Sequence, residues 1–214
     1  MKNSGIDILP GERVKLPTKY GHFELIPFQE KSSGVEHIAL IKGNLNSNDI
    51  VLTRIHSACA TGDLFGSLKC DCGEQLIQAM KRIENNGNGV VVYLQQEGRG
   101  IGLMNKIKAY KLQEEGMDTI EANVHLGFAS DEREYQIGAE ILSFLGIHKV
   151  KLLTNNPDKI LGLEQNNIQV VKRIPLIIQS NPFNKNYLDT KEIRMGHQLS
   201  EEKPEIQGYD NRHI

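Results

Sequence analysis

The sequence predicts an α/β fold, a mixed sheet flanked by helices, and three observations lead to it. The chain opens with strand-like runs. Its later part alternates apolar runs of strand length with stretches of helical periodicity. A hydrophobic content of 39% in 214 residues is enough to form a core. We therefore expect one domain over residues 1–199 and a polar, disordered tail over residues 200–214.

The first predicted strands alternate apolar and polar residues and are rich in β-branched side chains. They are HFELIPF (22–28), HIALIKG (37–43) and IVLTRIHS (50–57). A helix is predicted over 73–87, because Leu76, Met80 and Ile83 recur at helical spacing and Gly87 can end it.

The rest of the chain repeats an order of strand, glycine-containing connection and helix, which is typical of an α/β domain. The predicted elements are a buried strand (89–95), the glycine-rich QEGRGIG (96–102), a helix (103–116), a second helix (129–146), a strand (149–154), the turn NNPDK and a last strand (168–176).

Charge and composition exclude several classes of partner. A formal net charge of −2 without a basic stripe argues against nucleic-acid binding. The opening MKNSGIDILPGERVKLP has no apolar run of the kind found in signal peptides and membrane anchors. We therefore expect no nucleic acid, no membrane and a cytoplasmic location. In a reducing compartment three cysteines are poor candidates for disulfides, which favours metal binding or catalysis.

All three cysteines lie in CATGDLFGSLKCDCG, as Cys59, Cys70 and Cys72 with the spacing C-x10-C-x-C. A structural zinc site has four protein ligands, whereas a catalytic site has three and leaves the fourth position to water. Three thiols without a fourth cysteine favour an open zinc site. One alternative is a closed zinc site in which His56 is the fourth ligand. The other is that the three cysteines are buried and bind no metal.

Two other zinc chemistries are excluded by their motifs. A nucleobase deaminase needs H-x-E and P-C-x-x-C, and a zincin needs H-E-x-x-H; the sequence contains neither combination. Three thiolates would leave a zinc centre with a net charge of −1, so nearby cations are needed. Arg54 and Lys69 flank the cysteines in sequence and are expected to supply them.

Two segments are candidates for anion binding. QEGRGIG lies between a strand and a helix and contains Arg99, whose guanidinium suits phosphate, but it matches neither a P-loop nor a dinucleotide fingerprint. ASDERE is expected to begin a helix, with Asp131 as N-cap and Glu134 completing a capping box. Arg133 would then lie in a first helical turn, where a cation is unfavourable unless an anion is near.

Two further candidates have simpler alternatives. In LLTNNPDK, Thr154 ends a strand and Lys159 follows a turn, where ligands of α/β sheets gather; the alternative for Lys159 is a solvated lysine. Tyr110 shares a predicted helix face with Leu103 and Ile107, so its alternative is core packing.

Taken in order, four motifs resemble GTP cyclohydrolase II, the enzyme family that begins riboflavin biosynthesis: RIHSACATGDLFGSLKCDCGEQL, YLQQEGRGIGLMNKIKAYKLQEEG, DTIEANVHLGFASDERE and LLTNNPDKI. The similarity extends from residue 16 to residue 197. It implies a homodimeric catalytic domain with one Zn²⁺ per subunit and Mg²⁺. Such an enzyme converts GTP to formate, pyrophosphate and 2,5-diamino-6-(5-phosphoribosylamino)pyrimidin-4(3H)-one.

The resemblance also implies roles for single residues. Asp131 matches a proposed proton acceptor, Arg133 a proposed nucleophile toward the α-phosphorus, and Tyr110 a tyrosine linked to opening of the imidazole ring. The positions that match zinc ligands are Cys59, Cys70 and Cys72. Those that match nucleotide contacts are Arg54, Ile55, His56, Ser57, Ala58, Gln75, Glu97, Gly98, Arg99, Thr119, Thr154 and Lys159.

Two points modify these expectations. An arginine nucleophile is unusual, because its pKa lies above about 12, so the residues alone assign Arg133 to charge stabilisation. The chain also has Ala58 and Ala60 where the family usually has Glu and Leu, which removes a carboxylate beside the first cysteine. The alternative function is a relative that binds GTP around a zinc without full turnover, or stops at the formamide stage. The presence of Tyr110, Asp131 and Arg133 favours the enzyme.

Overall fold

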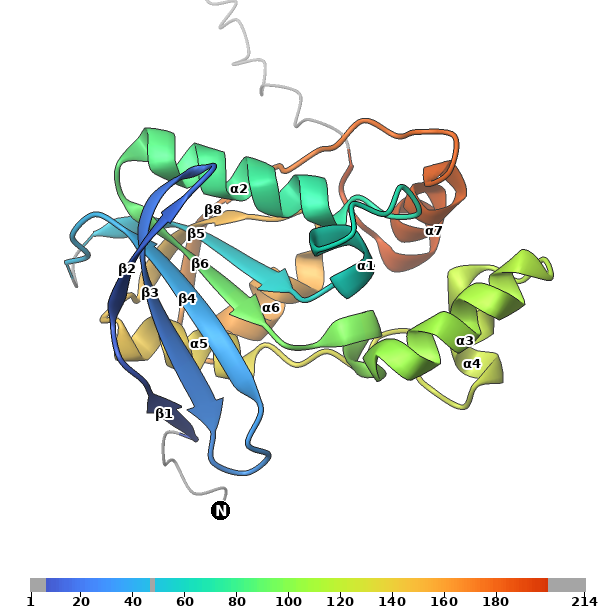
Figure 1. Cartoon of the computed structure of the whole chain (residues 1–214), viewed down its shortest axis with the longest axis horizontal. Helices are drawn as coiled ribbons and strands as arrows, with labels where there is room; N and C mark the ends of the chain where they lie inside the picture. Colours follow the sequence, from blue (N-terminus) through green and yellow to red (C-terminus); the bar gives the residue numbers. More distant parts are fainter. Residues whose placement is uncertain (1–6, 47–48, 200–214) are drawn as a thin grey trace, which may run out of the picture.

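The computed structural model describes residues 7–46 and 49–199. Within these residues eight strands form one mixed sheet in the order β1-β3-β4-β6-β5-β7-β8, with β2 paired to β3 beside this path. Helices cover both faces of the sheet (Figure 1), so the predicted fold class is confirmed. The tail predicted over 200–214 lies outside the described residues.

The antiparallel part of the sheet comes from the beginning of the chain. It consists of β1 (Ile8–Pro10), β2 (Val14–Thr18), β3 (Gly21–Glu30) and β4 (Glu36–Lys42). Burial alternates along β4, as expected for a strand with one face on the core. β4 then pairs antiparallel with β6, which joins this part to the rest of the sheet.

The parallel part positions the functional residues. It consists of β5 (Ile50–Ser57), β6 (Gly89–Leu94), β7 (Lys149–Leu153) and β8 (Gln169–Ile174). β5 is parallel to both β6 and β7, with Ser57 opposite Leu94 and Thr53 opposite Leu152. The segments that follow these three strands therefore leave the sheet at one edge, where ligands of α/β sheets bind.

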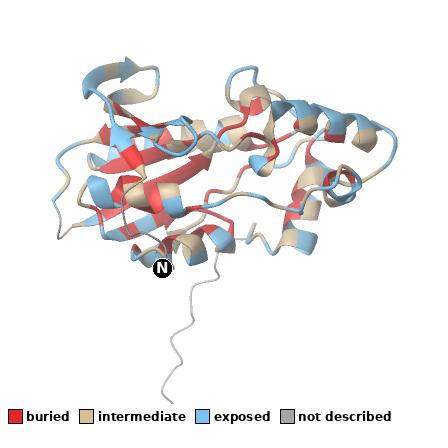
Figure 2. Cartoon of the chain, turned by 90° about the horizontal axis from the view of Figure 1, so that it is seen from below, coloured by how far each residue is buried: buried red, intermediate tan, exposed pale blue. Residues whose placement is uncertain are grey.

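Two apolar cores lie on opposite faces of the sheet. On one face, α2 (Cys72–Asn86) packs Ala79, Met80 and Ile83 against Leu52 and Val91. The other face carries α5 (Gln136–Phe144) and α6 (Pro157–Glu164), whose buried residues join the larger core. Figure 2 shows the buried strands between these covering layers.

The remaining elements lie at or beyond the carboxyl edge of the parallel strands. They are α1 (Ala60–Asp63), the short helix η1 (Glu97–Gly100), α3 (Gly102–Glu114), α4 (Thr119–His125) and α7 (Lys185–Met195). α3 and α4 pack together as an arm that projects from the sheet, and α7 lies beyond α1 (Figure 1). No helix in the described part of the chain has the length and apolar character needed to cross a membrane.

Most predicted elements are confirmed, including the helix over 73–87, which ends at Gly87 in the left-handed conformation with φ 76°. The helix predicted over 129–146 begins only at Gln136, so Asp131 is not an N-cap and Glu134 completes no capping box. The reason is local competition for hydrogen bonds. The Arg133 amide donates to Asp131 Oδ1 (3.1 Å) and the Glu132 amide donates to the Arg99 carbonyl (3.0 Å), which holds this segment as a loop.

Candidate active site

A cavity opens where β5, β6 and β7 end, and most of the predicted site residues line it. β5 contributes Arg54 and His56, the connection after β6 contributes Glu97 to Arg99, and the segment after β7 contributes Thr154. The other predicted residues on its wall are Ser57, Ala58, Cys59, Cys70, Cys72, Gln75, Tyr110, Thr119, Arg133 and Lys159.

Two predicted residues do not line the cavity. The Ile55 side chain is fully buried in the core, and only its carbonyl faces the site, where it accepts a hydrogen bond from Lys159 Nζ (2.8 Å). Asp131 forms an ion pair with Arg133, and it is Arg133 that lines the cavity.

The three cysteines form a group suited to a metal ion. Cys59 precedes α1, while Cys70 and Cys72 lie where α2 begins, and the three Sγ atoms are all within 4.8 Å of one another. Cys59 Sγ and Cys70 Sγ are 3.7 Å apart. Two thiolates on a tetrahedral zinc are separated by roughly 3.8 Å, because each Zn–S bond is about 2.3 Å long. The geometry of the sulfur atoms therefore fits zinc.

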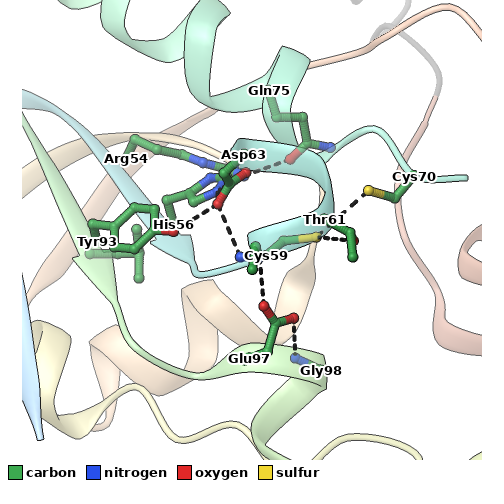
Figure 3. Close-up of polar contacts among 12 residues, drawn as sticks. Arg54, His56, Cys59, Thr61, Asp63, Cys70, Gln75, Tyr93, Glu97 and Gly98 are labelled. Atoms are coloured by element: carbon green, nitrogen blue, oxygen red, sulfur yellow. Dashed lines mark hydrogen bonds and ion pairs between the residues drawn. The ribbon is translucent and has the colours of Figure 1, made fainter. Parts of the chain in front are cut away.

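His56 does not belong to this group, so the closed site completed by His56 is not what the structure shows. Its Nε2 lies 3.1 Å from Asp63 Oδ2, and its ring stacks on Tyr93. Asp63 also accepts hydrogen bonds from the Cys59 amide (3.0 Å) and the Tyr93 hydroxyl (2.9 Å), as Figure 3 shows. His56 and Asp63 thus fix the backbone that carries the first cysteine.

Lys106 on α3 is the cation beside the cysteines. Its Nζ donates to Cys59 Sγ (3.1 Å), Thr61 Oγ1 (2.9 Å) and Glu97 Oε1 (2.8 Å). Burial alone would lower the pKa of Lys106, but its hydrogen bond to Glu97 and the charge of Cys59 raise it above its usual value. Lys106 therefore stays protonated next to the sulfur atoms.

The two cations expected from the sequence make their direct contacts elsewhere, although the charge of Cys72 acts on Arg54. Lys69 is exposed and pairs with Glu114 at 3.2 Å. Arg54 is buried, but its guanidinium donates to the Leu153 carbonyl (2.9 Å) and to Gln75 Oε1 (Figure 3). Neither forms a hydrogen bond to a cysteine sulfur in the described structure.

Glu97 connects the cysteine segment to the glycine-rich connection. One carboxylate oxygen accepts from the Ala60 amide, and the other accepts from the Gly98 amide (2.8 Å) and Lys106. These contacts use both oxygens of a nearly buried side chain. The neighbouring Ala58 is buried on the cavity wall, so the wall is apolar at that position.

Buried cations gather on another part of the wall. Burial lowers the pKa of Arg54 to about 10, although Asp71 opposes this shift. Burial, together with the charges of Arg54 and Arg133, lowers the pKa of Lys159 well below its usual value. Lys159 forms no ion pair with another described residue, and its Nζ donates to a carbonyl. Such a concentration of buried positive charge favours an anionic ligand.

Arg99 and Arg133 are brought together by the loop that replaces the predicted helix start. Arg99 adopts a left-handed conformation (φ 63°, ψ 37°), which is uncommon for a residue with a side chain and is found at functional sites. Its Nη1 donates to the Ser130 carbonyl (3.3 Å), while its Nη2 is buried without a partner in the described structure.

Arg133 and Asp131 form a two-pronged ion pair, with Arg133 Nε 2.8 Å from Asp131 Oδ1 and Nη2 bonded to Oδ2. Burial opposes both charges, but the pair raises the pKa of Arg133 and lowers that of Asp131. A guanidinium held in its protonated form is suited to stabilising negative charge.

Tyr110 faces the cavity rather than the core. Leu103 and Ile107, the residues expected to bury it, are 44% and 47% exposed. The Lys106 ammonium lies 5.7 Å from the centre of the Tyr110 ring, and burial raises the pKa of the phenol. Core packing is therefore the wrong interpretation for this tyrosine.

Several residues of the site had no signal in the sequence. Asp63 contacts His56 and Cys59 in its own segment, but Asp71 and Lys106 become recognisable only when distant segments meet. The same is true of three residues from α7 and the turn after it, which line the cavity: Tyr187, Lys191 and His197.

Comparison with known proteins agrees with the motifs. The GTP cyclohydrolase II family model matches residues 11–175. The chain is 58% identical over 189 residues to "Riboflavin biosynthesis protein RibBA" of Parabacteroides distasonis, covering 88% of this chain and 47% of that protein. It is 52% identical over 190 residues to "GTP cyclohydrolase-2" of Buchnera aphidicola, covering 89% of this chain and 98% of that protein.

The chain thus spans about half the length of the RibBA relative and nearly all of the Buchnera protein. Among solved structures, RibBX of A. baumannii, a two domain 3,4-dihydroxy-2-butanone 4-phosphate synthase, matches with a TM-score of 0.45 and 23% identity. That match covers 79% of this chain and 40% of the other.

Proposed function

Because the chain belongs to the GTP cyclohydrolase II family, we propose that it hydrolyses GTP in riboflavin biosynthesis. The reaction opens the imidazole ring at C8 to release formate, and it also releases pyrophosphate. The observation that carries the proposal is the meeting of three cysteine sulfurs and a set of buried cations in one cavity. Such a cavity suits a substrate with a base at one end and a triphosphate at the other.

The cysteine sulfurs are the proposed zinc ligands. When bound by Cys59, Cys70 and Cys72, Zn²⁺ supplies Lewis-acid activation for the hydrolysis at C8. Lys106 donates to Cys59 Sγ and so offsets the negative charge that three thiolates introduce. The Mg²⁺ implied by the family resemblance is proposed as the counter-ion of the triphosphate.

The cations on the cavity wall are the proposed triphosphate site. Arg99, Arg133 and Lys159 can stabilise the negative charge that develops as pyrophosphate leaves. Arg133 is assigned this electrostatic role, rather than nucleophilic attack, because Asp131 holds it in the protonated form. Asp131 then acts by orienting the guanidinium.

Tyr110 is the proposed proton donor for ring opening. Its hydroxyl carries a proton at neutral pH, as an ordinary phenol does, and burial raises its pKa further. The side chain lies on the cavity wall, on the same helix as Lys106. Gln75, Thr119 and Thr154 provide polar groups for the remaining nucleotide contacts.

We also propose that the chain forms a homodimer, as the family resemblance implies. Large apolar side chains are exposed on the projecting α3–α4 arm, at Leu103, Met104, Ile107 and Val124. Sedimentation equilibrium would show a mass of two chains; a monomer at all concentrations would contradict this part of the proposal.

Product analysis tests the proposed reaction. Purified protein loaded with Zn²⁺ is incubated with GTP and Mg²⁺, and formate, pyrophosphate, formamide and diaminopyrimidine products are measured. The proposal predicts formate and pyrophosphate. GTP binding without either product would identify a binding protein, and accumulation of the formamide would identify an enzyme that stops early. The Cys72→Ser variant should be inactive, whereas Glu192→Ala, at an exposed position on α7, should retain activity.

A further inference from the structure

The segment formed by α7 and the residues after it contributes to the cavity although it follows the part matched by the family model, which ends at residue 175. Tyr187 and Lys191 reach the cavity from α7, and His197 reaches it from the turn after the helix. Residues 185–198 thus form one wall of the site, and we call them the C-terminal segment.

A buried ion pair anchors this segment beside the cysteines. Lys191 Nζ donates to Asp71 Oδ1 (2.7 Å), and the side chains are 10% and 2% exposed. Asp71 precedes Cys72 and also accepts from Gln75 Nε2 (2.6 Å), and Gln75 in turn accepts from Arg54. Removing one partner of such a pair leaves a buried charge uncompensated, so loss of either Lys191 or Asp71 would destabilise the docked position.

Two backbone hydrogen bonds fix the position of His197. The His197 amide donates to the Lys191 carbonyl (3.0 Å), and the Gln198 amide donates to the Asn155 carbonyl in the segment after β7 (2.9 Å). The imidazole is therefore held against the same connection that leads to Lys159.

The imidazole has an unused hydrogen-bonding atom in a strongly positive environment. His197 Nε2 is buried and has no partner in the described structure, as is also true of Arg99 Nη2 and Asn156 Nδ2. The cations that act on His197 are Lys191, Arg133, Lys159 and Arg99. Burial and these charges lower the pKa of His197 to about 3, so the ring is neutral and one of its nitrogens carries a proton. Hydrogen-bond donors without a partner, together with cations around one cavity, favour a ligand rich in anionic oxygens.

We propose that the C-terminal segment is part of the nucleotide site, where His197 Nε2 donates a hydrogen bond to a phosphate oxygen of GTP and Lys191 acts as a positioning residue. This inference rests on GTP being the ligand, as proposed above. It assigns to His197 the recognition of the phosphates rather than of the guanosine part.

The test compares two ligands by calorimetry on the zinc-loaded full chain: a GTP analogue with a methylene bridge between the α and β phosphorus atoms, and guanosine. His197→Ala should weaken binding of the analogue about tenfold or more, the usual effect of losing a hydrogen bond to a charged group. Its binding of guanosine should change less than about twofold. His197→Gln, whose amide can donate from a similar position, should recover part of the affinity for the analogue.

Controls separate the possible failures. Glu192→Ala, on the exposed face of the same helix, should bind both ligands as the wild type does. If the wild type does not bind the analogue, the proposed function itself fails. If the wild type binds it and His197→Ala binds it equally well, only the inference about His197 is overturned. Equal losses for the analogue and guanosine would show that His197 merely supports the structure, and would also overturn it.

Discussion

The ammonium group of Lys106 lies 3.1 Å from Cys59 Sγ and 2.8 Å from Glu97 Oε1, so one buried cation donates hydrogen bonds to both a buried sulfur and a buried carboxylate. Three thiolates on zinc carry an excess negative charge, and a protonated amine in contact with one of them offsets it. Glu97 keeps the amine in place while it accepts from the backbone of Ala60 and Gly98. The contact therefore connects α3 to the proposed metal centre.

Lys106→Met should lower zinc affinity about tenfold or more, because the thiolates lose their neighbouring cation. The measurement is competition for zinc with a chromophoric chelator. Since the variant leaves the buried Glu97 carboxylate without its cation, circular dichroism first checks that Lys106→Met is folded, and Lys106→Arg, which keeps the positive charge, should retain most of the affinity. Lys108→Met, at an exposed position on the same helix, is the control. Unchanged zinc affinity in folded Lys106→Met, or an equal loss in Lys106→Arg, would refute this role of Lys106.

Gly62→Ala should disrupt the proposed metal centre while the sheet stays folded. A Cβ at position 62 would lie 2.8 Å from Cys70 Sγ, 3.3 Å from Cys59 Sγ and 3.2 Å from Cys72 Cβ, so at least one sulfur would have to move. We expect a loss of bound zinc, measured as metal per chain, with an unchanged circular dichroism spectrum. Gly138→Ala, where the added carbon meets only ordinary contacts of 3.5 Å or more, should keep its zinc. Full zinc occupancy in Gly62→Ala would contradict the explanation.

The sequence predicts the parts of the site that are local in the chain. The cysteine spacing, the strands before and after the cysteine segment in the chain, and Gly87 as a helix end are short-range signals, and the structure agrees with them. Asn156 and Pro157 are a further short-range signal, since they are the N-cap and first residue of α6, where the sequence analysis predicts only the turn NNPDK.

Other parts could not be predicted because they depend on tertiary contacts. ASDERE has the residues of a capping box, yet the bond from Glu132 to the Arg99 carbonyl holds it in a loop. Lys106 lies 47 positions from Cys59, and Lys191 lies 120 positions from Asp71. Nothing in a single sequence indicates which lysine will be buried beside which partner.

Tyr110→Phe should separate the two halves of the proposed reaction. The variant keeps the ring on the cavity wall but loses the phenolic proton, so formate release should slow by about a hundredfold, the usual contribution of a general acid. Pyrophosphate release should continue, because the cations that serve it are unchanged. Both products are measured in the same time course. Tyr20→Phe, outside the cavity, is the control, and equal loss of both products in Tyr110→Phe would remove Tyr110 from ring opening.

The pH dependence of stability should reveal His197. Its pKa is lowered from 6.5 to about 3 in the folded protein, first by burial and then by the charges of Lys191, Arg133, Lys159 and Arg99. As the pH falls, a group whose pKa is lower in the folded protein takes up its proton in the unfolded chain first. The free energy of unfolding is therefore unaffected by His197 above its unfolded pKa of 6.5 and decreases as the pH falls from 6.5 toward 3.

His197→Gln removes this proton uptake, whereas the uptake by groups common to both proteins cancels in the comparison. Urea unfolding of wild type and variant at pH 7.5 and pH 5 gives the difference in their free energies of unfolding. Between pH 7.5 and pH 5 this difference should change by up to about 2 kcal/mol in favour of the variant. The value follows because pH 5 lies about 1.5 units below the unfolded pKa, and each unit corresponds to about 1.4 kcal/mol. A difference that is independent of pH would mean that His197 is not held neutral among the cations, and that it protonates as readily in the folded chain as in the unfolded one.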